Sequence, residues 1–213
     1  MIKTTIETKV FFENAYNDLS ISDERKSLLI SIADKIYEEF EDRNKVNLNF
    51  ICTHNSRRSQ LAQVWSFFAI EYFKLNNINA FSGGTEVTAF HRNTVKSLQK
   101  TDFNFNVEDF SHQNPQYLIS FKGTKKTIKG FSKLYDNENN EYPYLAITTC
   151  DHADENCPFI PDAIERFHLP YVDPKAADNT EYQNEKYLET SKQIAGEIYF
   201  IFDEVDKLLN NEE

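Results

Sequence analysis

The chain has 213 residues, a formal net charge of −11 and three cysteines. This length suits one domain with additions, and the acidic balance argues against a broad nucleic-acid-binding surface. No apolar run approaches the length of a membrane span, and the N-terminus lacks the apolar segment of a signal peptide. An odd, small number of cysteines does not suggest a disulfide framework. We therefore expect a cytoplasmic protein whose partners are neither nucleic acid nor membrane.

The first 45 residues are predicted to form a helical extension. Ser20 or Ser22 can cap a helix through its side-chain oxygen, and apolar side chains between residues 28 and 40 recur at helical spacing. The remaining residues, 46–213, then form the main domain.

Strands and helices alternate through the main domain. Apolar residues alternate over 46–50, which predicts a first strand, and a predicted helix with an aromatic stripe starts at Ser59. Further strands are predicted at 78–82, 117–121, 131–135 and 145–149, with helices at 93–100 and from 181 onward. This order indicates an α/β fold with a mainly parallel central sheet and helices on both faces. Ligands of such sheets bind beyond the carboxyl ends of the strands, where Cys52, Gly83 and Cys150 are expected.

The segment from Cys52 to Ser59 joins the first strand to the helix that follows. Five residues separate Cys52 from Arg58, and Ser59 comes directly after. A loop that enters a helix N-terminus points several backbone N–H groups at one place, which attracts a tetrahedral anion. Arg58 can grip two oxygens of that anion, and the helix dipole and Arg58 favour the thiolate of Cys52. The segment is therefore predicted to be a nucleophile set in an anion-binding loop; the alternative is a buried structural cysteine.

The other two cysteines, Cys150 and Cys157, follow the strand predicted at 145–149. Three interpretations stay open from the residues alone. The two thiols are unrelated, or they form a metal site together with His152 and Asp154, or they are a redox pair. The spacing fits no common zinc module. A flexible polar loop would allow a labile disulfide if the Cα atoms approach within about 7 Å, and such a bond belongs to a catalytic cycle.

Several motifs together resemble a known enzyme family. The sequence Cys-Thr-His-Asn-Ser-Arg-Arg-Ser-Gln-Leu-Ala over 52–62 is similar to the catalytic loop of the low-molecular-weight protein tyrosine phosphatases. The turn over 82–86 is similar to the Gly-Thr-Glu turn of that family, and 172–174 to its acid loop. Cys150 and Cys157 match the redox pair of its thioredoxin-coupled arsenate reductase branch, which the chain resembles most.

The chain departs from that pattern in four places. His54 stands where the loop usually has glycine, and Arg57 where it often has a second cysteine. The segment of about 105–144 is longer than in the family, and its predicted strands surround a Lys- and Gly-rich turn, which indicates a β-hairpin insertion. The extension over 1–45 is also additional. The resemblance makes 46–213 the catalytic domain.

The resemblance implies an arsenate reductase that needs no cofactor and no metal. Cys52 would attack arsenate, and Asp173 would protonate the leaving oxygen. The residues expected to hold the arsenate or phosphate-type oxyanion are Thr53, His54, Asn55, Ser56, Arg57, Arg58 and Ser59. Cys150 would then take over the bond from Cys52, and Cys157 from Cys150, until a thioredoxin-like partner restores the thiols.

Two other functions remain open at this stage. A phosphatase acting on phosphotyrosine or small phosphoesters would need only Cys52, Arg58 and Asp173, because arsenate and phosphate share shape and charge. A non-catalytic oxyanion sensor or redox-regulated binding protein would need the loop alone. The cysteine pair favours the reductase.

Overall fold

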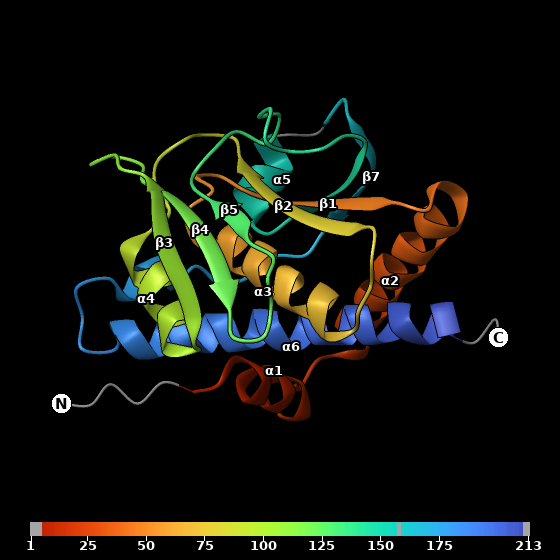
Figure 1. Cartoon of the computed structure of the whole chain (residues 1–213), viewed down its shortest axis with the longest axis horizontal. Helices are drawn as coiled ribbons and strands as arrows, with labels where there is room; N and C mark the ends of the chain where they lie inside the picture. Colours follow the sequence, from red (N-terminus) through yellow and green to blue (C-terminus); the bar gives the residue numbers. More distant parts are fainter. Residues whose placement is uncertain (1–5, 157–158, 211–213) are drawn as a thin grey trace.

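The computed structural model describes residues 6–156 and 159–210 of the chain. The helices are α1 (Thr8–Asn17), α2 (Asp23–Arg43), α3 (Arg58–Tyr72), α4 (Arg92–Lys100), α5 (Asp151–Asn156) and α6 (Gln183–Asn210), with a 3-10 helix at Pro174–Ala177. The strands are β1 (Val46–Cys52), β2 (Ile78–Gly84), β3 (Phe103–Asp109), β4 (Gln116–Phe121), β5 (Ile128–Gly130), β6 (Tyr144–Thr148) and β7 (Ala163–His168). Figure 1 shows α6 running along the length of the molecule, with α1 on its outer side.

A parallel sheet in the order β2-β1-β6-β7 forms the centre of the fold. Its side chains alternate between two cores, as the pleat of a strand requires. Leu48 and Phe50 of β1 join the large core beneath α2, α3 and α6, whereas Ile51 joins a smaller cluster that contains Tyr144 and Ala153. The predicted α/β fold, with a parallel sheet and helices on both faces, is confirmed.

The insertion forms a second, antiparallel sheet in the order β3-β4-β5. The predicted strand at 117–121 is confirmed as β4, but the prediction of a strand over 131–135 is wrong. The backbone N–H of Ser132 donates to Asn114 Oδ1 (3.1 Å) and that of Lys133 donates to Asn55 Oδ1 (3.0 Å). The segment meets the sheet in an isolated parallel bridge, in which the backbone of Gly84 donates to Lys133 (2.8 Å) and accepts from Tyr135 (3.0 Å). Side chains therefore satisfy part of its backbone, and the strand that pairs with β4 lies just before it, at 128–130.

The segment after Cys150 was expected to be a flexible polar loop, but it begins with helix α5. Two ion pairs tie this helix to β7, a strand that the sequence did not predict: Arg166 to Asp154 (3.1 Å) and His168 to Asp151 (3.0 Å). Only one position of β7 is fully buried, so its sequence lacks a continuous apolar run.

Both helices of the N-terminal segment pack on α6. Phe11 and Phe12 of α1 stack on Trp65 of α3, with ring centroids 5.3 and 5.8 Å apart. Arg25 of α2 forms two hydrogen bonds with Glu197 of α6, at 3.1 and 2.8 Å, and Glu197 is fully buried. None of the helices within the described residues is both long and apolar enough to cross a membrane.

The Arg25–Glu197 pair also reaches the strand end that leads to the predicted acid loop. Arg25 donates to the carbonyl of Pro170 (3.1 Å), and its guanidinium lies 5.1 Å from the ring of Tyr171. The backbone of Tyr171 in turn accepts a hydrogen bond from Arg58 (3.0 Å). The N-terminal segment thereby supports the segment that holds Arg58, at the start of α3.

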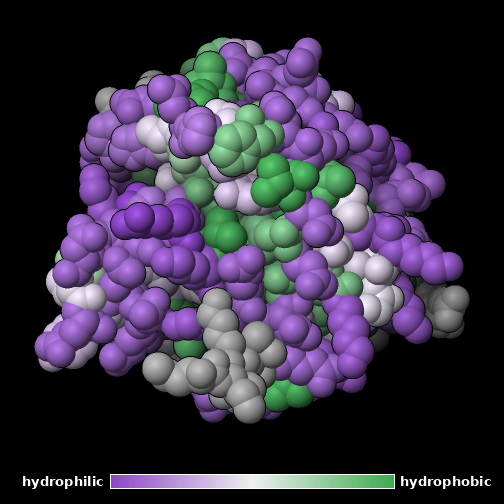
Figure 2. Space-filling model, turned by 60° about the vertical axis from the view of Figure 1, so that its left-hand side comes forward, coloured by the Kyte–Doolittle hydropathy of each residue, from purple (hydrophilic) through white to green (hydrophobic). Residues whose placement is uncertain are grey.

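The space-filling view in Figure 2 shows a mostly hydrophilic surface with a cluster of apolar side chains near the middle of that face. The most exposed large apolar side chains among the described residues are Val172, Phe159 and Phe110. Val172 precedes Asp173, so an apolar side chain projects from the predicted acid loop.

We expect Arg25→Met to lower the free energy of unfolding by about 3–5 kcal/mol, because it leaves the buried carboxylate of Glu197 without its partner. Urea unfolding followed by circular dichroism measures this loss. Lys192→Met is the matched control: Lys192 also joins α6 to the N-terminal segment, but its pair with Asp18 is exposed and should contribute less than about 1 kcal/mol. Equal losses in both variants would contradict this account.

Candidate active site

Residues 53–57 form the loop between β1 and α3, and we call this segment the catalytic loop. Cys52 ends β1 and pairs in register with Gly84, the last residue of β2. A Cβ atom on Gly84 would lie 2.7 Å from the carbonyl oxygen of Thr53 and 2.8 Å from the nitrogen of Asn55. Glycine at this position therefore lets the catalytic loop pack directly against the end of β2.

Asn55 holds the catalytic loop in shape from within. Its backbone has a φ of 45°, in the left-handed region that Asn tolerates better than most residues. Its side chain is buried and makes three hydrogen bonds: Oδ1 accepts from Gln60 Nε2 (3.1 Å) and from the backbone of Lys133 (3.0 Å), and Nδ2 donates to Ser59 Oγ (2.9 Å). Gln60 and Lys133 were not among the site residues that the sequence suggested.

Ser59 connects Asn55 to the sulfur of Cys52. Ser59 Oγ lies 3.1 Å from Cys52 Sγ, and both side chains are buried. Ser59 Oγ accepts from Asn55 Nδ2, and its own proton can be donated to the sulfur when Cys52 is a thiolate. A hydroxyl donor at this distance stabilises a thiolate, which is the reactive form of cysteine.

The catalytic loop also leaves hydrogen-bond donors unused. Among the residues that the structure describes, none of the backbone N–H groups of 53–57 donates to a backbone or side-chain acceptor. Nε of Arg58 is buried and has no partner either. Buried donors without partners are uncommon in folded proteins and call for an explanation. A tetrahedral oxyanion bound beside Cys52 would satisfy them.

The other nitrogens of Arg58 hold it against the predicted acid loop. Nη1 donates to the carbonyl of Tyr171 (3.0 Å) and Nη2 to Asp173 Oδ2 (2.8 Å). The second oxygen of Asp173 accepts from the backbone of Lys175 (2.9 Å) and caps the 3-10 helix that Pro174 begins. Cys52 and Arg58, predicted from one motif, and Asp173, predicted from another, therefore meet at one end of the sheet.

The side chain of Arg57 is held by two hydrogen bonds, and its Nε lies 3.9 Å from Asp173 Oδ1. Its Nε donates to the hydroxyl of Tyr187 (2.7 Å) and its Nη2 to Asp178 (2.9 Å). Although burial opposes it, contacts with Tyr187, Asn93 and Arg57 lower the pKa of Asp178, so its carboxylate stays charged. Burial and the nearby Arg57 lower the pKa of His91, which lies 3.1 Å from the Tyr187 hydroxyl. Arg57 thereby ties the catalytic loop to α6 and to the end of the 3-10 helix.

His54 and Ser56 connect the catalytic loop to the segments around it. The carbonyl of His54 accepts from Thr88 and Ser132, while its half-exposed ring pairs with Glu86 at 3.2 Å. Ser56 donates through its hydroxyl to the carbonyl of Ala89 (2.7 Å). His54 therefore fits in place of the usual glycine by turning its ring outward, toward Glu86.

Cys150 lies beside the catalytic loop, and both it and Cys52 are free thiols. Its Sγ is 3.5 Å from Thr53 Oγ1, and that hydroxyl is also 3.2 Å from His152 Nδ1. Cys150 and Cys52 share the small buried cluster on one face of the sheet. Cys157 lies outside the described residues. Within those residues, no group of three or more His, Cys, Asp or Glu side chains is arranged to hold a metal ion.

Comparisons with known proteins bear on this arrangement. No family model matches the chain. In sequence the chain is 29% identical over 140 residues to an arsenate reductase of Brevibacillus brevis. The matched segment covers 66% of this chain and 85% of the relative. The chain is 27% identical over 140 residues to an arsenate reductase of Bacillus cereus, with the same coverage. The resemblance to arsenate reductases is confirmed. These relatives are enzymes by name, which also confirms, at that level, the prediction of an enzyme.

Solved structures give weaker likenesses. A thioredoxin-dependent arsenate reductase of Corynebacterium glutamicum is 14% identical, with a TM-score of 0.40. The superposed region covers 97% of this chain and 85% of the Corynebacterium chain. A YwlE mutant from Bacillus subtilis is 16% identical, with a TM-score of 0.48, and covers 78% of this chain and 99% of its own. Because both scores lie below 0.5, neither likeness decides how this chain acts.

We expect Asn55→Gly to lower the free energy of unfolding by about 1–3 kcal/mol, because it leaves the buried backbone N–H of Lys133 without an acceptor. Asn55→Ala should cost about 1–2 kcal/mol more, since alanine does not favour a positive φ. Urea unfolding measures both. A stable Asn55→Gly variant whose Cys52 reacts with iodoacetamide as fast as in the unsubstituted protein would contradict the role given to this side chain.

Proposed function

We propose that this chain is an arsenate reductase in which Cys52 is the nucleophile and Cys150 the second thiol of a disulfide relay. The observation that carries this proposal is the position of Cys150: a second free, buried thiol lies against the catalytic loop, 3.5 Å from Thr53 Oγ1. The sequence similarity to curated arsenate reductases supports it. A phosphatase mechanism gives no role to this thiol.

Substrate binding uses the donors that the loop leaves free. Arsenate oxygens would accept from the backbone N–H groups of 53–57 and from Nε of Arg58. This is a local positive field in a protein whose net charge is −11. Of the side chains proposed to hold the oxyanion, Arg58 would bind it directly, because its Nε is buried and has no partner, whereas Arg57 would keep the loop in position through Tyr187 and Asp178.

The first chemical step joins sulfur to arsenic. The Cys52 thiolate attacks arsenate, a sulfur–arsenic bond forms, and one arsenic–oxygen bond breaks. Hydroxide is a poor leaving group, so Asp173 delivers the proton with which that oxygen departs as water. Asp173 lies 2.8 Å from Arg58 and thus beside the oxyanion that Arg58 binds.

The second step reduces arsenic. The Cys150 thiolate attacks Cys52 Sγ, a disulfide forms, and the sulfur–arsenic bond breaks with its electron pair left on arsenic. Arsenate has then become arsenite. Cys157 would attack Cys150, free Cys52 and move the disulfide to the pair Cys150–Cys157. A thioredoxin-like dithiol would reduce that pair by exchange and become a disulfide itself. Such a cycle needs a reducing compartment, so the expected cytoplasmic location is part of this proposal.

A phosphatase of the same fold is the second candidate, and one observation favours it. Cys52, Arg58 and Asp173 are already assembled without any contribution from the other cysteines. These three groups suffice to form a phosphocysteine and to protonate a phenolic or alcoholic leaving group.

Replacing Cys150 with Ser separates the two candidates. In a reductase, Cys150→Ser should abolish arsenite production with thioredoxin and thioredoxin reductase, because no thiol can release the arsenic from Cys52. Hydrolysis of p-nitrophenyl phosphate should persist, and Cys52→Ser should abolish both activities. Cys157→Ser should allow one turnover of arsenite and then stop. Unchanged arsenate turnover in Cys150→Ser would reject the relay, and phosphoester hydrolysis without any arsenite production would favour the phosphatase.

Replacing Asp173 with Asn tests the assigned acid. We expect arsenate reduction to slow by about 10²–10⁴-fold, which is the usual contribution of a positioned proton donor. Asp203→Asn serves as the control, because Asp203 pairs with Lys207 on the second half of α6 and takes no part in the site. Steady-state rates under saturating arsenate measure the effect. A loss below about threefold would remove Asp173 from the mechanism.

A further inference from the structure

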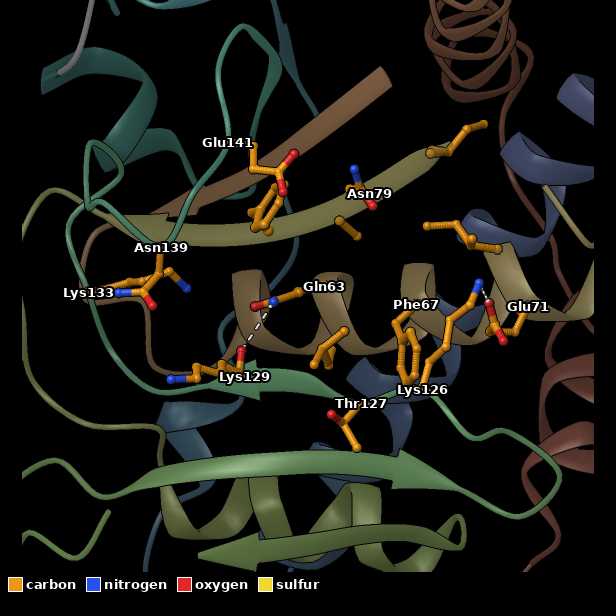
Figure 3. A pocket seen from close by; sticks show the side chains of 15 residues that line it. Gln63, Phe67, Glu71, Asn79, Lys126, Thr127, Lys129, Lys133, Asn139 and Glu141 are labelled. Carbon is orange, nitrogen blue, oxygen red and sulfur yellow. Dashed lines mark hydrogen bonds and ion pairs between the residues drawn. The ribbon is translucent and has the colours of Figure 1, made fainter. Parts of the chain in front are cut away.

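We propose that the cavity between β2, β5 and α3 binds a small organic carboxylate, which pairs with the amine of Lys133. The cavity has a volume of about 320 Å³. Figure 3 shows β2 above it, β5 below it and α3 behind it, with Lys133 beside Asn139 at one end and the pair Lys126 and Glu71 at the other. This site does not depend on the function proposed for the catalytic loop.

Lys133 is the feature that calls for a ligand. The residue is only 3% exposed, yet it lines the cavity. No described residue forms a hydrogen bond or ion pair with its Nζ. The Nζ atom lies over the ring of Phe131, 5.0 Å from the ring centroid. Burial lowers the pKa of Lys133 to about 7. Buried lysines in folded proteins are normally paired, so an unpaired one at a cavity wall is unusual.

The other charged groups that face the cavity are already neutralised. Lys126 pairs with Glu71 (2.6 Å), Lys129 with Glu108 (3.0 Å), and Glu141 with Lys45 (2.6 Å). Protonated Lys133 is therefore left as the single positive charge without a counterion among these groups. An anion is the ligand that complements it.

The rest of the lining favours an organic anion over an inorganic one. Phe67, Ile70 and Ile128 supply apolar walls. The amide nitrogen of Gln63 already donates to the carbonyl of Lys129 (3.3 Å), and that of Asn79 to Asn47 (3.1 Å). Each of these amides keeps one N–H free among the described residues, but arsenate or phosphate has no apolar surface to place against the apolar walls. A monocarboxylate needs one cation for its head and apolar surface for its body, and both are present.

The cavity is separate from the catalytic loop, but Lys133 contributes to both. The backbone N–H of Lys133 donates to Asn55 Oδ1, whereas its side chain lines the cavity. Spectroscopic probes can therefore distinguish the two sites. Residues 128–130 and 79–81 report the cavity, and residues 53–57 report the catalytic loop.

Binding should weaken as the pH rises. A carboxylate pairs with the protonated amine, and the pKa of Lys133 without a ligand is about 7. Below that pH the amine of Lys133 is protonated and can pair with a carboxylate. Above it, the amine must take up a proton before it can pair, so the apparent affinity for the carboxylate should fall by about tenfold per pH unit. The other charged groups at the cavity, Glu71, Lys126, Lys129 and Glu141, are all held in ion pairs.

Titration of the full-length, ¹⁵N-labelled protein with sodium benzoate tests the proposal, and benzamide is the uncharged control ligand. Spectra are recorded about one pH unit below and about two units above the pKa of Lys133, at constant ionic strength. We expect saturable shifts of the amides at 79–81 and 128–130 with benzoate at the lower pH, binding at least about tenfold weaker at the higher pH, and no comparable binding of benzamide.

Two variants complete the test. Lys133→Met keeps the length of the side chain and removes a buried amine without a partner, so we expect it to fold and to bind benzoate at least about tenfold more weakly. Lys129 lines the same cavity but is paired with Glu108, so the control variant Lys129→Met should bind benzoate as the unsubstituted protein does. Shifts confined to residues 53–57, equal binding by Lys133→Met, or equal binding at both pH values would each overturn the proposal.

Discussion

The side-chain amide of Asn55 is the interaction on which the candidate site depends. The catalytic loop makes no hydrogen bonds through its own backbone N–H groups within the described structure, so something else must hold its shape. Asn55 does so by joining Gln60, Lys133 and Ser59 through one buried side chain. The loop can therefore keep its donors free for an oxyanion and still be rigid. Ser59, held by the same amide, aligns with the sulfur of Cys52.

The neighbouring residues Arg57 and Arg58 have different roles: Arg58 supplies an unpaired nitrogen, and Arg57 holds the loop in position. Arg58 has a buried, unpaired Nε and is held by Tyr171 and Asp173, while Arg57 binds Tyr187 and Asp178. In an acidic protein, a positive field must be built locally from such groups and from loop amides. The Arg57 contacts join three separate elements, and this explains how a bulky residue is accommodated within the catalytic loop.

The parts of the chain outside the central domain also support the site. Arg25 in the N-terminal segment pairs with buried Glu197 and contacts Pro170 and Tyr171, whose backbone holds Arg58. The insertion supplies the backbone of Lys133 to Asn55. The extension therefore acts on the site through Pro170 and Tyr171, and the insertion acts through Asn55. The insertion also forms one wall of the cavity in which Lys133 lacks a counterion.

Local patterns in the sequence determined the central α/β order, the strand–loop–helix that carries Cys52, and the set of residues around it. These signals are short-range: alternation, helical spacing, and a cysteine and an arginine at fixed separation. The tertiary structure alone decided that Arg57 binds Tyr187 and Asp178, that Asn55 accepts from the backbone of Lys133, and that 131–135 is not a strand. It also revealed β3 and β7, and the pairing of Arg25 with Glu197. Each of these depends on partners far apart in the chain. A sequence shows which side chains can form a hydrogen bond or ion pair, but only the fold shows which of them come within about 3 Å of each other.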